Sequence, residues 1–218
     1  MQYEIKQEEK FRFIEVGEGE PLLLLHGLFG ALSNFAGQIE TFRHTHKVIV
    51  PLLPLLDLDL LHTTVGGLEK FLHRFIEYRD YKNINLLGNS LGGHVGLMYI
   101  LRHPERIKSL TLTGSSGLFE SGMGDTYPKR GDYEYIRKKT ELTFYDPKMA
   151  TKELVDELYE TVNVRIKAVK IIALAKSAIR NNLGEEVRQI KQPTLLIWGN
   201  NDAITPPFVG QEFHKLIP

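Results

Sequence analysis

The sequence contains no cysteine. This absence excludes disulfide bonds, a thiol nucleophile, and zinc or iron–sulfur sites built on cysteine. The chain also has no net charge, because 27 Lys and Arg residues balance 27 Asp and Glu residues. A balanced chain has no overall electrostatic attraction to nucleic acid or to anionic lipid. We therefore expect neither nucleic acid nor a membrane among its partners.

Long apolar runs and repeats are also lacking. No apolar run approaches the roughly 20 residues that span a bilayer. The opening residues, MQYEIKQEEKFRF, alternate polar and apolar and have no apolar signal-peptide core. There is no internal repeat, no metal-ligand cluster and no dinucleotide fingerprint. The sequence therefore predicts a soluble, cytoplasmic protein without a cofactor or metal, and it leaves the oligomeric state open.

Short apolar segments with strand character recur along the 218 residues. Residues 2–6 and 11–16 alternate polar and apolar, which predicts an antiparallel hairpin with its turn at residues 8–10. Residues 21–25 read PLLLL, and an unbroken apolar run is typical of a strand covered on both faces. Further strands are predicted at residues 47–50, 84–87, 110–113 and 194–198.

Helical patterns separate several of these strands. Apolar residues between 65 and 76 share one helix face, which Thr63 or Thr64 would cap, and residues 91–102 form a second helix. Strands that alternate with helices predict an α/β fold with a mostly parallel, doubly wound sheet. Residues 119–190 contain helical patterns without a convincing strand. We expect them to form a helical cap, or lid, inserted between two parts of one core, residues 1–118 and 191–218.

The motif that carries most information lies between a predicted strand and a predicted helix. Residues 88–92 read GNSLG, a Gly-x-Ser-x-Gly pattern centred on Ser90. A sharp strand-to-helix turn presents such a serine hydroxyl at the edge of the sheet in a strained conformation. Side chains at Gly88 and Gly92 would be expected to collide across the turn. The alternative is that small residues occupy this turn for packing alone and that Ser90 has no catalytic role.

A serine nucleophile needs stabilisation of the negative charge that develops on the substrate oxygen. The residues after the strand at 21–25 read HGLFG and would lie beside the same edge of the sheet. The backbone N–H groups of Leu28 and Leu91 are then natural oxyanion donors, with Gly27 supporting the first. His26 is expected to be a structural hydrogen-bonding residue of this loop, and a catalytic role for it is the alternative.

The acid is expected after a later strand. Asp202 follows the strand at 194–198 and is the carboxylate of its loop, WGNNDAITPP. The loop after the strand at 110–113 reads GSSG and has no carboxylate, so Asp202 is the favoured candidate. Its alternative role is that of a turn aspartate that caps the helix beginning near Pro206.

Together these motifs resemble those of the α/β-hydrolase family, in particular its cap-bearing serine hydrolases. The resemblance covers nearly the whole chain and rests on HG at 26–27, GNSLGG at 88–93, RHP at 102–104, WG at 198–199 and the loop of Asp202. It implies an α/β-hydrolase fold, Ser90 as nucleophile, Asp202 as triad acid, and the amides of Leu28 and Leu91 as the oxyanion hole. The GNSxGG form is similar to that of meta-cleavage-product hydrolases and of carboxylesterases.

The pattern departs from the family at the histidine of the triad. The resemblance implies a Gly-His loop roughly 25–30 residues after the acid, following one more strand. None of the eight histidines lies at that position, and the sequence runs only 218 − 202 = 16 residues beyond Asp202. We therefore expect a C-terminal piece with a strand, the histidine loop and a helix to be lacking. The chain as given would then be inactive without its base.

Three functions are consistent with these motifs. The leading hypothesis is a serine hydrolase that cleaves carboxylic esters or related small acyl substrates through an acyl-enzyme on Ser90. The second is hydrolysis of a carbon–carbon bond in a meta-cleavage-type diketone, for which Lys129, Arg130 or Arg165 would bind the substrate carboxylate. The third is a binding protein that keeps the fold without catalysis.

Overall fold

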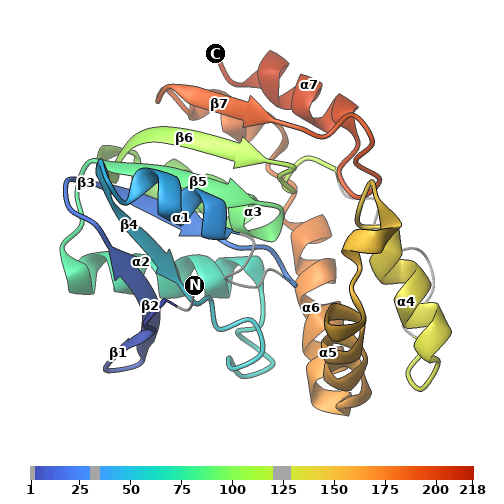
Figure 1. Cartoon of the computed structure of the whole chain (residues 1–218). Helices are drawn as coiled ribbons and strands as arrows, with labels where there is room; N and C mark the ends of the chain where they lie inside the picture. The colour runs from blue at the N-terminus through green and yellow to red at the C-terminus, as the bar shows by residue number, and fades with distance from the viewer. Residues whose placement is uncertain (1–2, 30–34, 120–128) are drawn as a thin grey trace.

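A seven-stranded sheet forms the centre of the molecule (Figure 1). A computed structural model of the chain describes residues 3–29, 35–119 and 129–218. The strand order is β1-β2-β4-β3-β5-β6-β7, antiparallel at β1-β2-β4 and parallel from β4 to β7. The strands are β1 (Lys6–Glu8), β2 (Phe11–Val16), β3 (Glu20–Leu25), β4 (His46–Pro51), β5 (Ile84–Asn89), β6 (Ile107–Thr113) and β7 (Thr194–Ile197). The predicted mostly parallel α/β sheet is confirmed.

Helices follow most of the parallel strands. The α-helices are α1 (Ala36–Phe42), α2 (Val65–Arg79), α3 (Leu91–Arg102), α4 (Tyr133–Glu141), α5 (Lys152–Asn163), α6 (Arg165–Arg180) and α7 (Pro207–Leu216). Short 3-10 helices are η2 (Pro104–Arg106), η3 (Pro147–Met149) and η4 (Gly184–Gln189). Thr64 is the N-cap of α2, and its side chain accepts a hydrogen bond from the N–H of Gly67. The sequence did not predict α1.

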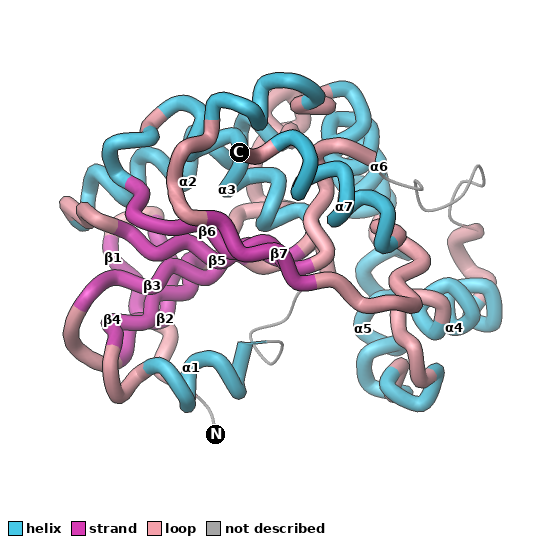
Figure 2. The backbone as a smooth tube through the Cα atoms, turned by 90° about the horizontal axis from the view of Figure 1, so that it is seen from above, coloured by secondary structure: helices cyan, strands magenta, loops and turns pink. Residues whose placement is uncertain are grey.

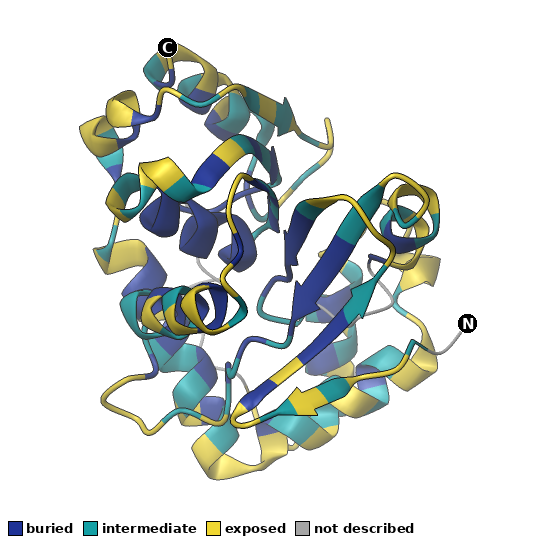
Figure 3. Cartoon of the chain, turned by 90° about the vertical axis from the view of Figure 1, so that its left-hand side faces the viewer, coloured by how far each residue is buried: buried dark blue, intermediate teal, exposed yellow. Residues whose placement is uncertain are grey.

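Both faces of the sheet are covered, which explains the unbroken apolar run of β3. Leu23 and Leu25 pack in the main core with α2, α3 and α7. Leu22 and Leu24 point to the other face and pack with Ile39 of α1. All four leucines are buried, and the central strands are correspondingly dark in Figure 3. The sheet is therefore doubly wound, as the run of leucines predicts.

The N-terminal hairpin is present, but its first strand is displaced along the sequence. It comprises Lys6–Glu8 instead of residues 2–6, and it reverses at Glu9, whose φ is +48°. The chain before it turns toward α1, where the hydroxyl of Tyr3 donates to Glu40 (2.6 Å). Residues 1 and 2 of the predicted strand lie outside the described residues.

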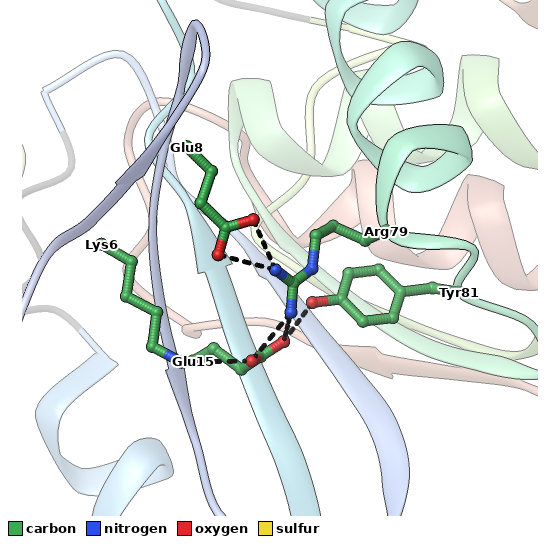
Figure 4. A network of polar contacts seen from close by, with 5 residues as sticks. All are labelled: Lys6, Glu8, Glu15, Arg79 and Tyr81. Carbon is green, nitrogen blue, oxygen red and sulfur yellow. Dashed lines mark hydrogen bonds and ion pairs between the residues drawn. The ribbon is translucent and has the colours of Figure 1, made fainter.

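A polar network ties this hairpin to the far end of α2 (Figure 4). The guanidinium of Arg79 donates to both oxygens of Glu8 (2.7 and 2.8 Å) and to both oxygens of Glu15 (3.0 Å). Tyr81 and Lys6 also donate to Glu15. Burial opposes ionisation of Glu15, yet the Tyr81 hydrogen bond and the Arg79 charge outweigh it and lower the pKa of this carboxyl. The network fixes the edge of the sheet opposite to β7.

Helices α4, α5 and α6 are inserted between β6 and β7. Figures 1 and 2 show α4 and α5 beyond the carboxyl ends of the strands. Within residues 129–190, which belong to the predicted helical segment 119–190, the described structure contains helices and turns but no strand. At the other side of this insertion, β7 lies at the edge of the sheet, with Leu195 and Ile197 exposed. The helical insertion therefore stands above the sheet edge at which parallel strands end.

Candidate active site

Ser90 occupies the sharp turn between β5 and α3. Its backbone has φ +52° and ψ −121°, a conformation that L-residues rarely adopt. The strain, on the order of 1–3 kcal/mol, is compensated by the surrounding structure. The Ser90 N–H donates to the carbonyl of Thr113 (3.1 Å), and the Ser90 carbonyl accepts from the N–H of His94 (3.2 Å) in the first turn of α3. Ser90 is half-buried at the carboxyl end of β5.

Both glycines that flank Ser90 are needed, because a β-carbon at either position would collide with backbone atoms. A β-carbon on Gly88 would lie 2.5 Å from Cα of Gly93, and one on Gly92 would lie 2.1 Å from the carbonyl oxygen of Leu25. The turn therefore packs against its own helix on one side and against the end of β3 on the other. The expected collision across the turn is confirmed for Gly88, whose β-carbon would also lie 2.8 Å from the carbonyl oxygen of Gly92, whereas a β-carbon on Gly92 would collide with the end of β3.

The loop after β3 lies directly beside the serine. A β-carbon on Gly27 would stand 3.2 Å from Cβ of Ser90. The next amide in the chain is that of Leu28, and the amide that follows Ser90 is that of Leu91, at the beginning of α3. The N–H groups of Leu28 and Leu91, the two expected oxyanion donors, thus belong to two segments that meet at Ser90. The positive end of the α3 dipole adds to their potential.

His26 is held inside this loop by both of its ring nitrogens. Its Nε2 accepts the N–H of Leu53 (3.0 Å), so Nδ1 carries the proton of the neutral ring and donates to the carbonyl of Gly27 (2.9 Å). Burial lowers the pKa of His26, although the hydrogen bond to Gly27 acts in the opposite direction. A neutral ring with both nitrogens occupied orients the loop but cannot accept a proton from Ser90.

His94 is likewise engaged in the interior. Its side chain is fully buried, and its Nε2 lies 2.9 Å from the carbonyl oxygen of Asn181, just after α6. Burial lowers the pKa of His94 to about 4, against the effect of the Asn181 hydrogen bond. Its Nδ1 faces the hydroxyl of Ser116 (3.4 Å), which also contacts the Ser90 carbonyl. His94 therefore links α3 to the end of the helical insertion.

Asp202 lies in the loop after β7 and is fixed by three hydrogen bonds. Its Oδ1 accepts the N–H groups of Ile204 (2.9 Å) and Thr205 (2.8 Å), and its Oδ2 accepts the Thr205 hydroxyl (3.1 Å). Asp202 therefore holds the turn at residues 202–205, but it does not cap α7, whose first turn receives no side-chain hydrogen bond. A β-carbon on Gly114 would lie 2.9 Å from Oδ2, so the carboxylate stands over the end of β6.

Strand β6 connects the positions of Ser90 and Asp202, because it pairs with β5, which precedes Ser90, and with β7, which precedes Asp202. Gly114 follows Thr113, whose carbonyl accepts both the N–H of Ser90 and the side-chain amide of Asn89 (3.0 Å). Gly114 has φ +48°, which favours glycine. Sequence reasoning did not identify Gly114 or Thr205 as supports of the carboxylate. The signal in the sequence for Thr205 is the Thr-Pro pair at the end of the loop WGNNDAITPP.

The helical insertion packs against the loop that follows β3. Ile136, Val162 and Ile171, one from each of α4, α5 and α6, form a small buried cluster that packs against Leu28 and Phe29. The ammonium of Lys170 in α6 donates to the carbonyl of Leu56 (2.7 Å), in the loop that also holds His26. These contacts join the insertion to the loops that follow β3 and β4.

The described part of the chain shows neither a metal-ligand cluster nor a membrane-spanning helix. Among the described residues, no three His, Asp or Glu side chains are grouped as metal ligands would be. No helix in the described part of the chain combines the length and apolar character needed to cross a bilayer.

Comparisons with known proteins agree with this arrangement. The family model for the alpha/beta hydrolase fold matches residues 20–148. Lipase 1 of Psychrobacter immobilis is 28% identical over 242 residues, covering 96% of this chain and 71% of the lipase. A 2-hydroxy-6-oxo-6-phenylhexa-2,4-dienoate hydrolase of Comamonas testosteroni is 25% identical over 214 residues, covering 88% of this chain and 74% of that enzyme.

A solved structure extends the match. MGS-MChE2, an alpha/beta hydrolase enzyme from the metagenome of lagoon sediments of Mar Chica, Morocco, is 42% identical, with a TM-score of 0.80. The alignment covers 99% of this chain and 84% of that one. The match of the family model to more than half of the chain, together with this structural neighbour, shows that the chain belongs to the alpha/beta hydrolase family.

Proposed function

We propose that the chain is a serine hydrolase of carboxylic esters or related acyl substrates. The observation that carries the proposal is the strained Ser90 turn, flanked by Gly27 on one side and by the end of β6, under Asp202, on the other. The hydrolase class is supported by relatives named as a lipase, a dienoate hydrolase and an alpha/beta hydrolase enzyme.

In the proposed reaction, Oγ of Ser90 bonds to the carbonyl carbon of the ester and its proton passes to a base. The carbonyl π pair moves to oxygen, where the N–H groups of Leu28 and Leu91 stabilise the negative charge. Collapse of this intermediate breaks the ester C–O bond, and the alcohol leaves with the proton. Water then releases the acyl group from Ser90 by the same steps.

Asp202 is proposed to orient the base, which in this family is a histidine. His26 and His94 are not suited to this role, because each is buried with its ring nitrogens engaged by protein atoms. The expectation of a histidine in a Gly-His loop after the acid stays a prediction. A fixed carboxylate over the end of β6 supports the proposed role of Asp202.

Ester cleavage is favoured over carbon–carbon cleavage by the charges of the insertion. A meta-cleavage substrate carries a carboxylate that needs a positively charged partner. Lys129, Arg130 and Arg165, the candidates from the sequence, are all exposed. Exposed cations of this kind are normally solvated and contribute little to binding. We therefore propose an ester substrate for the site.

We also propose that residues 119–190 act as a lid and that the protein is cytoplasmic.

The test uses a fluorophosphonate probe and nitrophenyl esters of different chain lengths. It is performed on the product of the complete reading frame and on its Ser90→Ala variant. We expect the probe to label the peptide that contains Ser90, and ester turnover to fall by roughly three to six orders of magnitude in the variant. A ring-cleavage diketone assayed in parallel separates the two hydrolase candidates.

Two outcomes would contradict the proposal. If the probe labels no serine and no ester is turned over, Ser90 is not a nucleophile. If the diketone is cleaved much faster than every ester, the carbon–carbon alternative is correct. Saturable binding of esters without turnover would instead favour the non-catalytic binding protein.

A further inference from the structure

Two serines in the loop that follows β6 are buried, and the proposed reaction gives neither a part. Ser115 is fully buried and Ser116 is 4% exposed. A buried hydroxyl group costs free energy unless it forms hydrogen bonds. The Ser115 hydroxyl donates to the carbonyl of Ser116 (2.8 Å), whereas the Ser116 hydroxyl donates to the carbonyl of Ser90 (3.4 Å). The side chain of Ser116 therefore contacts the turn of the proposed nucleophile.

The carbonyl oxygen of Ser90 accepts three hydrogen bonds, and two of them come from Ser116. The donors are the N–H of His94 (3.2 Å), the N–H of Ser116 (3.3 Å) and the Ser116 hydroxyl (3.4 Å). On the other side of Ser90, its own N–H donates to the carbonyl of Thr113 (3.1 Å). Residues 113–116 thus hold both peptide groups that flank Ser90. A strained backbone persists where its surroundings hold it in this way.

The peptide group between Ser90 and Leu91 contains both the carbonyl that Ser116 holds and the N–H proposed as an oxyanion donor. Because a trans peptide group is planar, its N–H points opposite to its carbonyl. The contacts at the Ser90 carbonyl therefore determine where the Leu91 N–H points. Hydrogen bonds to this carbonyl also polarise the peptide group, which makes its N–H a stronger donor.

The beginning of α3 is shaped to receive the two serines. A β-carbon on Gly93 would lie 2.2 Å from Oγ of Ser115, so the loop can approach α3 because residue 93 has no side chain. The next residue, His94, places Nδ1 3.4 Å from the Ser116 hydroxyl. Since Nε2 of His94 faces the carbonyl of Asn181, Nε2 carries the proton and Nδ1 accepts. Both acceptors of the Ser116 hydroxyl thus lie at the beginning of α3.

We propose that Ser116 is a positioning residue for the oxyanion hole, because it holds the Ser90 carbonyl and thereby directs the N–H of Leu91 toward the substrate oxygen. The inference rests on the proposed function, in which Ser90 is the nucleophile. Ser116 does not touch the substrate in this role and acts through one peptide group. Gly93, the last residue of GNSLGG, then serves the same end by leaving room for the loop.

The test is Ser116→Ala in the product of the complete reading frame, with Ser115→Ala as the matched control. Each variant removes one buried hydroxyl from the same loop, and the hydrogen bond of Ser115 is the shorter one. Loss of a whole oxyanion donor lowers kcat by roughly 10²- to 10³-fold. A misdirected donor should cost less, so we expect Ser116→Ala to lower kcat for a nitrophenyl ester by about 5- to 20-fold. KM should change by less than about twofold, since the donor acts mainly in the transition state.

The control variant should separate positioning from a general loss of structure. We expect Ser115→Ala to lower Tm at least as much as Ser116→Ala does, because it loses the shorter hydrogen bond. Its kcat should nevertheless stay within about twofold of the parent value, because its hydroxyl does not bond to the Ser90 carbonyl.

A trifluoromethyl ketone inhibitor reports on the oxyanion hole directly. Oγ of Ser90 adds reversibly to the ketone carbon, the serine proton passes to the base, and the carbonyl π pair leaves an alkoxide at the oxyanion position. The inhibition constant Ki should rise in Ser116→Ala by about the factor by which kcat falls. In Ser115→Ala it should stay near the parent value.

The amide of Leu91 gives a readout that needs no turnover. In ¹H–¹⁵N spectra of the same proteins, the Leu91 resonance should shift more in Ser116→Ala than in Ser115→Ala. The physical reason is that the first variant removes a hydrogen bond from the carbonyl of the same peptide group.

Two results would overturn the inference. In the first, the two serine variants have equal kcat and Ki values. In the second, the Leu91 resonance shifts no more in Ser116→Ala than in Ser115→Ala. A parent protein that neither turns over esters nor reacts with the fluorophosphonate probe would instead refute the proposed function, and the inference with it.

Discussion

The Cα of Gly27 lies so close to Ser90 that a β-carbon on residue 27 would stand 3.2 Å from Cβ of the serine. A contact of this length requires one of the two loops to shift by a few tenths of an ångström. Either shift would move the Leu28 amide relative to the serine hydroxyl. The proposed oxyanion hole therefore depends on the absence of a side chain at position 27.

Gly27→Ala should consequently lower kcat for a nitrophenyl ester by about 10- to 100-fold, because displacements well below 1 Å are costly in an active site. KM should change much less, since the altered donor acts mainly in the transition state. Gly66→Ala is a matched control, as its β-carbon would meet only ordinary contacts, the nearest at 3.8 Å. Equal kcat values for the two variants would disprove the proposed role of the Leu28 amide.

The Asp202→Asn variant tests whether Asp202 is the acid of the catalytic triad. The amide can keep one acceptor oxygen for the N–H groups of Ile204 and Thr205, so the loop should retain its shape. The variant loses the negative charge that would stabilise a protonated base. In the product of the complete reading frame, kcat should fall by about 10⁴-fold, as for the corresponding change in a serine protease. Steady-state kinetics and thermal melting are measured together.

Two variants of Thr205 test how much the hydrogen bond from its hydroxyl supports Asp202. Thr205→Val removes the hydroxyl that donates to Oδ2 of Asp202 (3.1 Å), whereas Thr205→Ser keeps it. We expect a loss of about tenfold in kcat for the valine variant and near-normal activity for the serine variant, in line with loss of one hydrogen bond to a charged group. Full activity of Asp202→Asn would rule out Asp202 as the acid, whatever the Thr205 variants do.

Elements set by local pattern were predictable from the sequence. Helix α3 begins and ends at the predicted residues, because Ser90 begins the turn and Pro104 prevents continuation of the helix. The run of leucines in β3 requires two covered faces, and the structure has them. The order of strand, glycine-flanked serine and helix likewise needs no tertiary information.

Features set by long-range packing were not predictable. The seven residues of α1 contribute one fully buried side chain, Ile39, which is too little for a periodic signal. The requirement for glycine at position 92 comes from the carbonyl of Leu25, far away in the sequence.

Gly92→Ala should therefore destabilise the fold more than a glycine-to-alanine change normally does. Its β-carbon would lie 2.1 Å from the Leu25 carbonyl oxygen and 2.6 Å from that of His26, and backbone atoms cannot move aside cheaply. We expect a loss of about 3 kcal/mol or more in the free energy of unfolding. Gly37→Ala in α1, which meets nothing within 4 Å, should instead stabilise by about 0.5–1 kcal/mol. Chemical denaturation of both variants checks this, and similar midpoints would contradict it.

Acid should destabilise the protein through His94 well before the carboxylates titrate. Burial lowers the pKa of His94 to about 4 in the folded state, whereas the unfolded value is 6.5. The unfolded chain therefore binds a proton first as the pH falls, so the His94 contribution is intact above pH 6.5 and declines between pH 6.5 and 4. The full shift corresponds to about 3 kcal/mol. His26, whose pKa burial also lowers, acts in the same direction.

Thermal melting between pH 8 and 5 measures this effect without interference from Glu15. The lowered pKa of Glu15 means that its contribution is lost only at more acidic pH, below its ordinary value of 4.5. The wild-type Tm should be constant above pH 7 and fall steadily below pH 6.5. His94→Gln replaces the titrating ring by an amide that can still donate to Asn181, so its Tm should start lower and depend less on pH. A variant whose Tm falls as steeply as that of the wild type would show that His94 does not control the acid sensitivity.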